Sequence, residues 1–131
     1  MKLYFTISEL LYSDVANKNN ISNIPDKNAL DNILCLIFYC LQPIRNLIGK
    51  PMIITSGYRC SSLNSLVGGV SNSQHTKGEA VDFIVKAMKP NHIIDIIKDS
   101  SIEFDQLINE FDKWVHISFS KSKNRKQILK Y

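Results

Sequence analysis

The chain has 131 residues, of which 44% are hydrophobic and 21% are charged, and its formal net charge is +4. This length suffices for one domain with a buried core, and the apolar fraction excludes an intrinsically disordered chain. No apolar run approaches the about 20 residues that cross a bilayer, so we expect no membrane span. We therefore expect residues 1–131 to form a single domain that is monomeric.

The beginning of the chain, residues 1–9, leads directly into a folded element. It lacks the long apolar stretch and the small-residue cleavage site of a secretory signal peptide. We therefore expect synthesis in the cytoplasm without a signal peptide, with release or delivery by another factor if the substrate lies outside.

The three cysteines, Cys35, Cys40 and Cys60, are odd in number and form no C-x-x-C pair. This usage argues against a disulfide framework and fits reduced thiols. Cys35 and Cys40 lie in an apolar segment, where we expect them to fill the core. Cys60 follows Arg59 and has no neighbour that would activate its thiol.

The positive charge is concentrated in residues 121–131, which hold five basic side chains and no acid: Lys121, Lys123, Arg125, Lys126 and Lys130. The other 120 residues carry 11 basic against 12 acidic side chains. A solvated segment is the simplest interpretation, and attraction to an anionic polymer is the alternative. We do not expect nucleic acid as a partner, because Tyr131 is the only aromatic residue available for base stacking.

Helical signals dominate the first fifty residues. Thr6-x-x-Glu9 is a capping-box pattern that predicts a short first helix. Residues 17–25 are polar and turn-rich, which predicts a loop. Over residues 29–48, apolar side chains recur at helical spacing, with Pro43 predicted to kink or split the helix and Gly49 to end it.

The remainder of the chain alternates between predicted strands and short helices. The predicted strands are 52–56, 80–85, 104–111 and 114–119, the last two joined by a tight turn at Asp112-Lys113. Short helices are predicted over 62–67 and from Pro90 through Ile97, and residues 70–78 are predicted to be a polar loop. Helices packed on a small, mostly antiparallel sheet give an α+β domain.

Three side chains suited to metal binding occur in this part: His75 in the polar loop, Asp82 in the next strand and His116 in the last strand. Strand alternation places Asp82 opposite the core residues Val81 and Phe83, where a lone carboxylate carries a desolvation cost unless it is paired or metal-bound. Two imidazoles and a carboxylate leave a fourth zinc position open for water. Each residue also has an ordinary alternative, namely a hydrogen-bonded structural histidine or a capping or ion-paired aspartate.

The chain resembles the family of zinc D-Ala-D-Ala carboxypeptidases and L-alanyl-D-glutamate endopeptidases in two motifs, Ser73-x-His75-x-x-Gly78-x-Ala80-x-Asp82 and Trp114-Val115-His116-Ile117-Ser118. That family cleaves peptidoglycan stem peptides, includes phage endolysins and shares its fold with hedgehog signalling domains. The similarity covers nearly the whole chain, including Ser56-Gly57-Tyr58-Arg59 and Phe104-Asp105-Gln106-Leu107-Ile108.

The resemblance implies that His75, Asp82 and His116 hold Zn²⁺, which would polarise the scissile carbonyl and acidify a water molecule. It implies that Arg59 contacts the substrate's carboxylate or the developing oxyanion, since a guanidinium is a permanently charged fork. A surface or N-cap ion pair is the alternative for Arg59. Ser73 is expected either to hydrogen-bond the substrate peptide or to hold the His75 loop.

At the general base, this sequence departs from many relatives. Many carry an acid three residues before the last histidine ligand, where this chain has Lys113, and a lysine needs a strongly lowered pKa to act as a base. The compact subgroup that the chain resembles has its acid at the position of Glu110. A three-residue loop over 111–113 would place Glu110 on the face of the last ligand, whereas a two-residue turn would direct it away. We predict Glu110 as the base, with Asp112 as the alternative.

The sequence therefore predicts a zinc peptidase of phage or prophage origin that cuts a peptide bond in peptidoglycan stem peptides. It would be a D-Ala-D-Ala carboxypeptidase or an L-Ala-D-Glu endopeptidase, with Glu110 and Arg59 catalytic and with Arg59 and Ser73 binding substrate. It would act on the cell wall after release or delivery, and its basic tail would offer a contact to anionic cell-wall polymer. The alternatives are a non-catalytic, zinc-stabilised binding module and a structural virion component that retains the fold.

Overall fold

The computed structural model describes residues 2–131. The helical elements are α1 (Ile7–Leu11), α2 (Asp14–Lys18), α3 (Lys27–Leu36), η1 (Ile37–Leu41), α4 (Gln42–Ile48), α5 (Ser61–Leu66), η2 (Gln74–Lys77) and α6 (Pro90–Lys98). The strands are β1 (Ile53–Ser56), β2 (Ala80–Ile84), β3 (Gln106–Glu110), β4 (Trp114–Ser118) and β5 (Gln127–Lys130). The predicted α+β class is confirmed. No helix within residues 2–131 is long and apolar enough to cross a membrane.

The five strands form one sheet in the order β1-β2-β4-β3-β5. Neighbouring strands are antiparallel except β3 and β5, which are parallel. The sheet is thus mixed but mostly antiparallel, as predicted. Strands β2 and β4, which carry two of the candidate metal ligands, lie side by side within the sheet and are each paired on both edges, so their positions are well constrained.

Strand β5 was not predicted. Its four residues are mostly exposed and show no alternation between apolar and polar side chains, so the usual strand signal is absent. The strand forms because the tail returns alongside β3, where Gln106 pairs with Gln127 and Asn109 with Lys130. Part of the basic tail is therefore an edge strand of the sheet.

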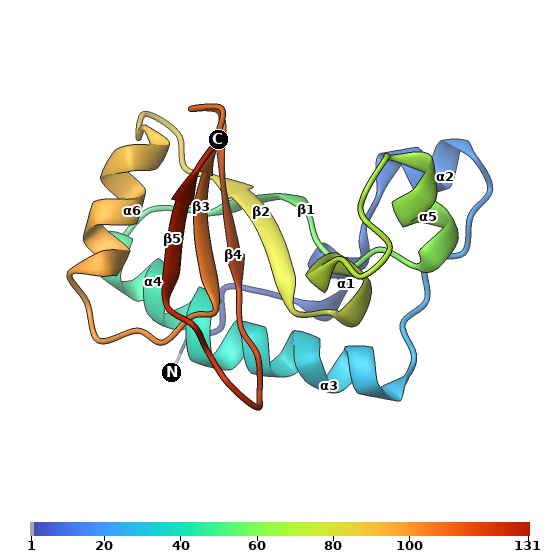
Figure 1. Ribbon diagram of the computed structural model, residues 1–131, viewed down its shortest axis with the longest axis horizontal. Helices are drawn as coiled ribbons and strands as arrows, with labels where there is room; N and C mark the ends of the chain where they lie inside the picture. Colours follow the sequence, from blue (N-terminus) through green and yellow to red (C-terminus); the bar gives the residue numbers. More distant parts are fainter. Residues whose placement is uncertain (1) are drawn as a thin grey trace.

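The core lies between one face of the sheet, the helical run α3–η1–α4 and helix α6 (Figure 1). The fully buried side chains on the sheet include Val115 and Ile117 of β4 and Val81 and Phe83 of β2. Val81 and Phe83 are the core residues predicted from strand alternation. Helices α1, α2 and α5 lie at the end of the molecule opposite α6 (Figure 1). Phe119, which follows β4, is half-buried and stacks on the exposed ring of Tyr39.

The long helical run is irregular near Pro43, as predicted. Helices α3 and α4 join through the π-helical turn η1, in which the Gln42 N–H bonds to the carbonyl of Ile37. Proline has no N–H and its ring crowds the preceding turn, so a widened turn accommodates Pro43 without breaking the helix. Gly49 ends α4 at a φ of 73°, which confirms it as the C-terminal stop.

The amino-terminal region contains one helix more than predicted. Thr6 caps α1 by accepting a hydrogen bond from the backbone N–H of Glu9, as the capping-box pattern indicated. The additional helix is α2, which is capped in the same way by Ser13 and ends at Lys18. The loop predicted over residues 17–25 therefore begins two residues later.

Gly78 lies between η2 and β2 and connects the loop of His75 to the long helix. Its φ is 74°, and a Cβ atom placed there would collide with the backbone carbonyl of Ala29 in α3. The neighbouring carbonyl of Lys77 accepts a hydrogen bond of 2.8 Å from Asn32, also in α3. The loop is thus packed closely against the helix, and only glycine fits at this position.

We predict that Gly78→Ala lowers the free energy of unfolding by roughly 2–4 kcal/mol, because left-handed strain and steric overlap act together. Gly68→Ala is the matched control, since Gly68 has a φ of 78° with no atom near its missing side chain. It should cost only the strain of about 1 kcal/mol. Urea unfolding followed by circular dichroism measures both values, and equal costs would contradict the close packing on Ala29.

Candidate active site

The structure brings the three predicted ligands together. Asp82 on β2 pairs directly with His116 on β4, and η2 brings His75 to the same face of the sheet. One potential ligand atom from each residue lies within 4.8 Å of the other two, and all three residues are buried. Strand pairing therefore makes neighbours of Asp82 and His116, which are 34 positions apart in sequence.

The ring of His75 is held by the backbone at one end. Its Nδ1 lies 2.8 Å from the carbonyl oxygen of Gly57, and because a carbonyl can only accept, Nδ1 carries the hydrogen. In the neutral ring Nε2 then has a free lone pair, and this atom lies 3.5 Å from Oδ2 of Asp82. Two acceptors that face each other in a buried site require a cation or a proton between them.

Asp82 is the central residue of the site. Its Oδ1 lies 3.0 Å from Nδ1 of His116, and its side chain is only 10% exposed. Burial raises the pKa of Asp82, but hydrogen bonds and charges from His116 and His75, when these rings are protonated, hold it well below its usual range. The carboxylate is therefore ionised at neutral pH, as metal coordination requires.

The donor set fits a zinc ion. A tetrahedral zinc with bonds of about 2.1 Å sets its ligand atoms about 3.4 Å apart. The separations are 3.0 Å from Asp82 Oδ1 to His116 Nδ1 and 3.5 Å from Asp82 Oδ2 to His75 Nε2, and one ligand atom from each of the three residues lies within 4.8 Å of the other two. Two imidazole nitrogens and one carboxylate oxygen also leave one position free for water or substrate, which distinguishes hydrolytic from structural zinc sites.

Glu110 lies next to these ligands. The register of the hairpin pairs Glu110 with Trp114 and Ile108 with His116, so the loop is the three-residue Phe111–Lys113. One carboxylate oxygen of Glu110 lies 3.9 Å from Nδ1 of His116. Burial and the charge of Asp82 raise the pKa of Glu110, while the cationic neighbours oppose this shift.

Asp112 lies outside the site. Asp112 accepts a hydrogen bond from Asn109, whose buried side chain projects from the face of β3 opposite Glu110. Asp112 also lies 3.7 Å from the ammonium group of Lys130. The tight turn predicted at Asp112-Lys113 is therefore wrong, and the three-residue loop over 111–113, the alternative that the sequence left open, is the one that forms. The geometry that would have made Asp112 the base is absent.

Arg59 faces the same carboxylate. One of its terminal nitrogens is 3.8 Å from Oδ2 of Asp82, and its Nε and other terminal nitrogen donate to Ser56 and Asn64 at 3.2 and 3.3 Å. Burial lowers the pKa of Arg59, and the charges of Asp82 and Glu110 raise it. The guanidinium also lines a pocket of about 300 Å³ between α1–α2, β1 and α5. Asn64, which holds this side chain, was not singled out in the sequence.

Ser73 holds the loop that carries His75. Its hydroxyl accepts a hydrogen bond of 3.2 Å from the His75 backbone N–H, and its carbonyl accepts one from Thr76. This is the loop-holding role of the two that the sequence left open. A contact between Ser73 and substrate stays a prediction.

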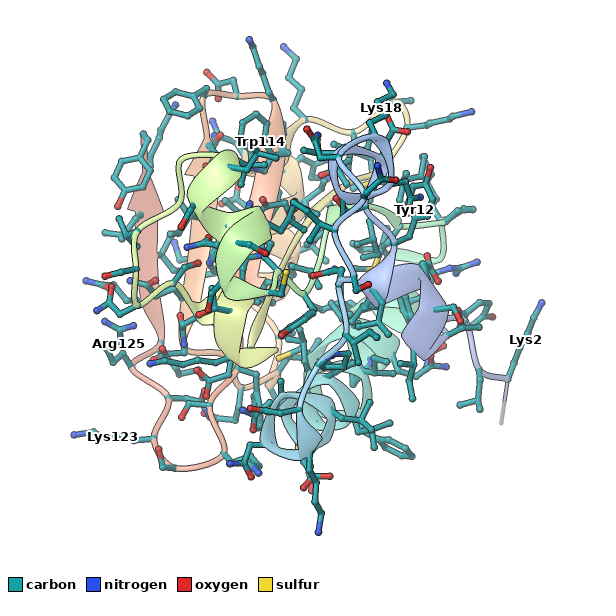
Figure 2. All side chains as sticks on the ribbon, turned by 90° about the vertical axis from the view of Figure 1, so that its right-hand side faces the viewer. Lys2, Tyr12, Lys18, Trp114, Lys123 and Arg125 are labelled. Carbon is teal, nitrogen blue, oxygen red and sulfur yellow. The ribbon has the colours of Figure 1, made fainter. Side chains whose placement is uncertain are left out.

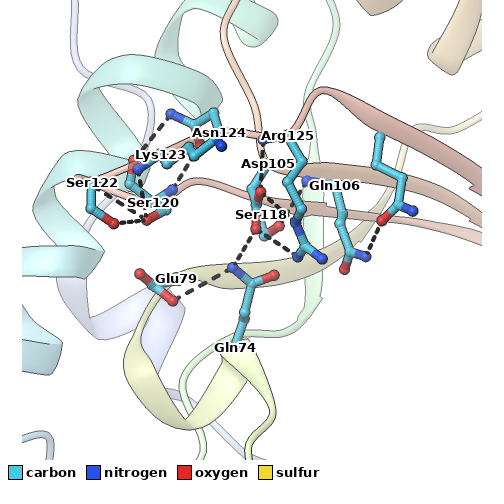
Figure 3. Close-up of polar contacts among 11 residues, drawn as sticks. Gln74, Glu79, Asp105, Gln106, Ser118, Ser120, Ser122, Lys123, Asn124 and Arg125 are labelled. Atoms are coloured by element: carbon cyan, nitrogen blue, oxygen red, sulfur yellow. Dashed lines mark hydrogen bonds and ion pairs between the residues drawn. The ribbon is translucent and has the colours of Figure 1, made fainter.

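A polar cluster beside the site was missed in the sequence. Gln74, the residue before His75, donates to the buried carboxylate of Asp105 at 2.9 Å (Figure 3). Arg125 donates hydrogen bonds to the same carboxylate from two side-chain nitrogens, at 2.9 and 2.8 Å. Hydrogen bonds from Arg125, partly opposed by burial, lower the pKa of Asp105 to about 2. The tail is thus tied to the His75 loop through a single carboxylate.

This cluster changes the interpretation of the basic tail. Arg125 is paired with Asp105, and Lys126 and Lys130 lie 3.8 and 3.7 Å from acidic side chains. Lys123, by contrast, projects from its loop into solvent (Figure 2). Three of the five basic side chains of the tail therefore lie near acidic side chains of the same chain. The attraction of the tail to an anionic cell-wall polymer stays a prediction.

Cys35, Cys40 and Cys60 are all free in the structure, and their reduced state in the cell stays a prediction. Cys40 is fully buried, and burial raises the pKa of its thiol to about 12, which suits core filler. Cys60 lies half-buried beside Arg59, with its sulfur 3.4 Å from the Ser62 hydroxyl.

We predict that the purified protein binds one zinc ion per chain, and that His75→Ala and His116→Ala each abolish this binding. Zinc at 1,000 times its dissociation constant should stabilise the wild type by about 4 kcal/mol, because it binds only the folded form. His92→Ala, which removes an exposed histidine far from the ligands in sequence, is the control. Metal analysis showing unchanged zinc in both ligand variants would contradict the site.

Comparisons with known proteins agree with this arrangement. The chain is 46% identical over 43 residues to the zinc D-Ala-D-Ala carboxypeptidase of Streptomyces albus G, a match that covers 32% of this chain. The aligned segment spans only 17% of that relative's length. The family model for peptidase M15 matches residues 3–118, which is most of the chain and includes Arg59, Glu110 and all three candidate ligands. The chain therefore belongs to the peptidase M15 family.

Proposed function

We propose that this protein is a zinc peptidase that hydrolyses an amide bond in peptidoglycan stem peptides. The observation that carries the proposal is that Glu110 lies on the same face of the sheet as the three ligands, 3.9 Å from His116. A ligand set with a free position and an adjacent carboxylate is the arrangement that hydrolysis needs. Membership of the M15 family and the match to a zinc carboxypeptidase support it.

The cofactor is Zn²⁺, in agreement with the prediction from the sequence. His75, Asp82 and His116 would hold it. A zinc ion bound there supplies Lewis acidity, which polarises a substrate carbonyl and acidifies water.

Glu110 would act as the proton shuttle. Its carboxylate accepts a proton from the attacking water and then delivers it to the leaving amine, as general bases in hydrolysis do. The side chain is 21% exposed, so water can reach it, while its position on a paired strand fixes its direction. The absence of an acid at Lys113 is thus compensated from the neighbouring strand.

Arg59 would bind the substrate beside the ligands. Its planar fork suits a carboxylate or a developing oxyanion, and Ser56 and Asn64 fix its orientation in advance. Both the D-Ala-D-Ala bond and the L-Ala-D-Glu bond of stem peptides have a free carboxylate on the residue after the scissile amide. The proposal therefore covers both bonds, and cell-wall lysis by a phage or prophage is the setting we propose.

Mass spectrometry of purified peptidoglycan digested with the zinc-loaded protein tests this function. The expected result is release of D-alanine or of fragments with a new amino-terminal D-glutamate, which also identifies the bond. Asp82→Asn is the control for adventitious hydrolysis. A wild-type protein that holds zinc and releases nothing from several wall types would favour the non-catalytic binding module.

We predict that Glu110→Gln lowers turnover on wall fragments by roughly 10²–10⁴-fold, the usual contribution of a general base. The amide keeps the size of the side chain but cannot take up the proton, so zinc content and melting temperature should change little. Asp112→Asn is the matched control and should retain nearly full turnover. The reverse ranking of the two variants would identify Asp112 as the base and contradict the role of Glu110.

We predict that Arg59→Lys keeps the fold and the zinc but loses most turnover, by roughly 10–10²-fold. Lysine retains the charge, but it lacks the fork that bonds Ser56 and Asn64 while facing a substrate. Steady-state kinetics on a soluble stem peptide measure the loss. Turnover equal to the wild type would show that Arg59 serves only the structure.

A further inference from the structure

Asn109 is a buried polar residue on the core face of β3. Its side chain is on the same face as that of Leu107, and its cross-strand partner on β4 is Val115. Asn109 is 1% exposed, and both neighbours are fully buried. Packing alone would favour an apolar side chain at this position. A buried amide carries a desolvation cost that its hydrogen bonds must offset, so the partners of Asn109 indicate what it does.

The amide of Asn109 bonds the hairpin loop through every polar atom. Its nitrogen donates to Oδ1 of Asp112 at 2.8 Å and to Oδ1 of Asn91 at 2.7 Å, and its oxygen accepts from the Asp112 backbone N–H at 2.9 Å. Two of the three bonds therefore end on the same loop residue. The third anchors the amide to the start of helix α6.

The loop that Asn109 contacts has an unfavourable backbone. Phe111 and Asp112 have φ values of 59° and 57°, in the left-handed region that non-glycine residues rarely adopt. Phenylalanine cannot stabilise that conformation by itself. The bonds from Asn109 supply part of the compensation, and a backbone bond of 3.1 Å from Phe111 to Tyr131 of the tail supplies more.

The shape of this loop sets the direction of Glu110. With three loop residues, Glu110 pairs with Trp114 and shares the face of His116. With a two-residue turn, Phe111 would take the place opposite Trp114, and Glu110 would face the core. The loop conformation and the position of the carboxylate are therefore linked through the register of one hairpin.

We propose that Asn109 is a positioning residue for Glu110: it fixes the left-handed loop and thereby holds the hairpin in the register that directs Glu110 toward the metal ligands. This inference rests on the proposed function. Asn109 touches neither the ligands nor the open face of the site, so it acts through Glu110 alone.

Asn109→Leu tests the proposal, since leucine matches the volume and the core face but makes none of the three bonds. Turnover on wall fragments should fall roughly 10- to 100-fold, the effect of misplacing a catalytic group by about 1 Å. Zinc content should stay at one ion per chain. In the Glu110→Gln background, the same substitution should change turnover less than twofold, because the group that it positions is already lost.

A rescue variant separates loop shape from general damage. Adding Phe111→Gly and Asp112→Gly to Asn109→Leu should restore most turnover, because glycine adopts left-handed φ values without support. If Asn109→Leu does not fold, Asp112→Ala replaces it, since Asp112 is exposed. Asp112→Ala should also lower turnover. Lys130→Met, which removes only the ion pair to Asp112, should leave turnover unchanged.

Cross-strand nuclear Overhauser effects provide a readout that needs no activity. In the wild type, the backbone of Glu110 should show contacts to the backbone of Trp114, its cross-strand partner. In Asn109→Leu these should weaken in favour of backbone contacts between Phe111 and Trp114. Contacts between the Phe111 and Trp114 rings are not diagnostic, because the rings are already 5.9 Å apart in the wild type. A folded Asn109→Leu variant with wild-type turnover and unchanged contacts would overturn the proposal. Equal fold losses in the wild-type and Glu110→Gln backgrounds would overturn it as well. An inert wild type with the expected change in contacts would refute the proposed function and leave the positioning role standing.

Discussion

The site depends on one buried carboxylate. Asp82 lies between two imidazoles and a guanidinium, and its side chain is only 10% exposed. An ionised group in such a place is stable only when its charge is balanced by close partners. Because His75 presents a lone pair to it, a cation completes the arrangement better than the protein alone does. A metal ion bound to Asp82 would balance the charge of this carboxylate and supply the Lewis acidity for hydrolysis.

The rest of the fold serves to hold groups around that carboxylate. Strand pairing places His116 beside Asp82, and the hairpin register places Glu110 on the same face. His75 is placed by the short helical turn η2, which packs on α3 at Gly78. The tail reinforces two of these elements, since Arg125 reaches the His75 loop through Asp105 and β5 pairs with β3. A catalytic group needs placement to within fractions of an ångström, and the paired strands and the Asp105 cluster supply that rigidity.

The sequence predicted much of this because its strongest signals are local. Alternation identified the core faces of β2 and β4, and the two motifs around His75 and His116 indicated the family. It missed β5, whose short exposed strand has no periodicity, and the Asp105 cluster, whose members lie far apart in sequence. The length of the hairpin loop stayed open because Phe111 is an improbable residue for a left-handed position. The hydrogen bonds that support this loop, from the buried amide of Asn109 and from the carbonyl of Tyr131, are not visible in a local pattern. The hairpin register and the position of the tail depend on polar contacts between residues far apart in sequence, which local patterns do not reveal.

A crystal structure of the zinc-loaded protein with anomalous data at the zinc edge would show where the metal binds. We expect one strong peak about 2.0–2.2 Å from Nε2 of His75, Nδ1 of His116 and a carboxylate oxygen of Asp82. The peak should vanish in Asp82→Asn crystals that retain the same fold. A wild-type map with no peak among these three residues, or with zinc held only elsewhere on the surface, would show that they do not form the metal site.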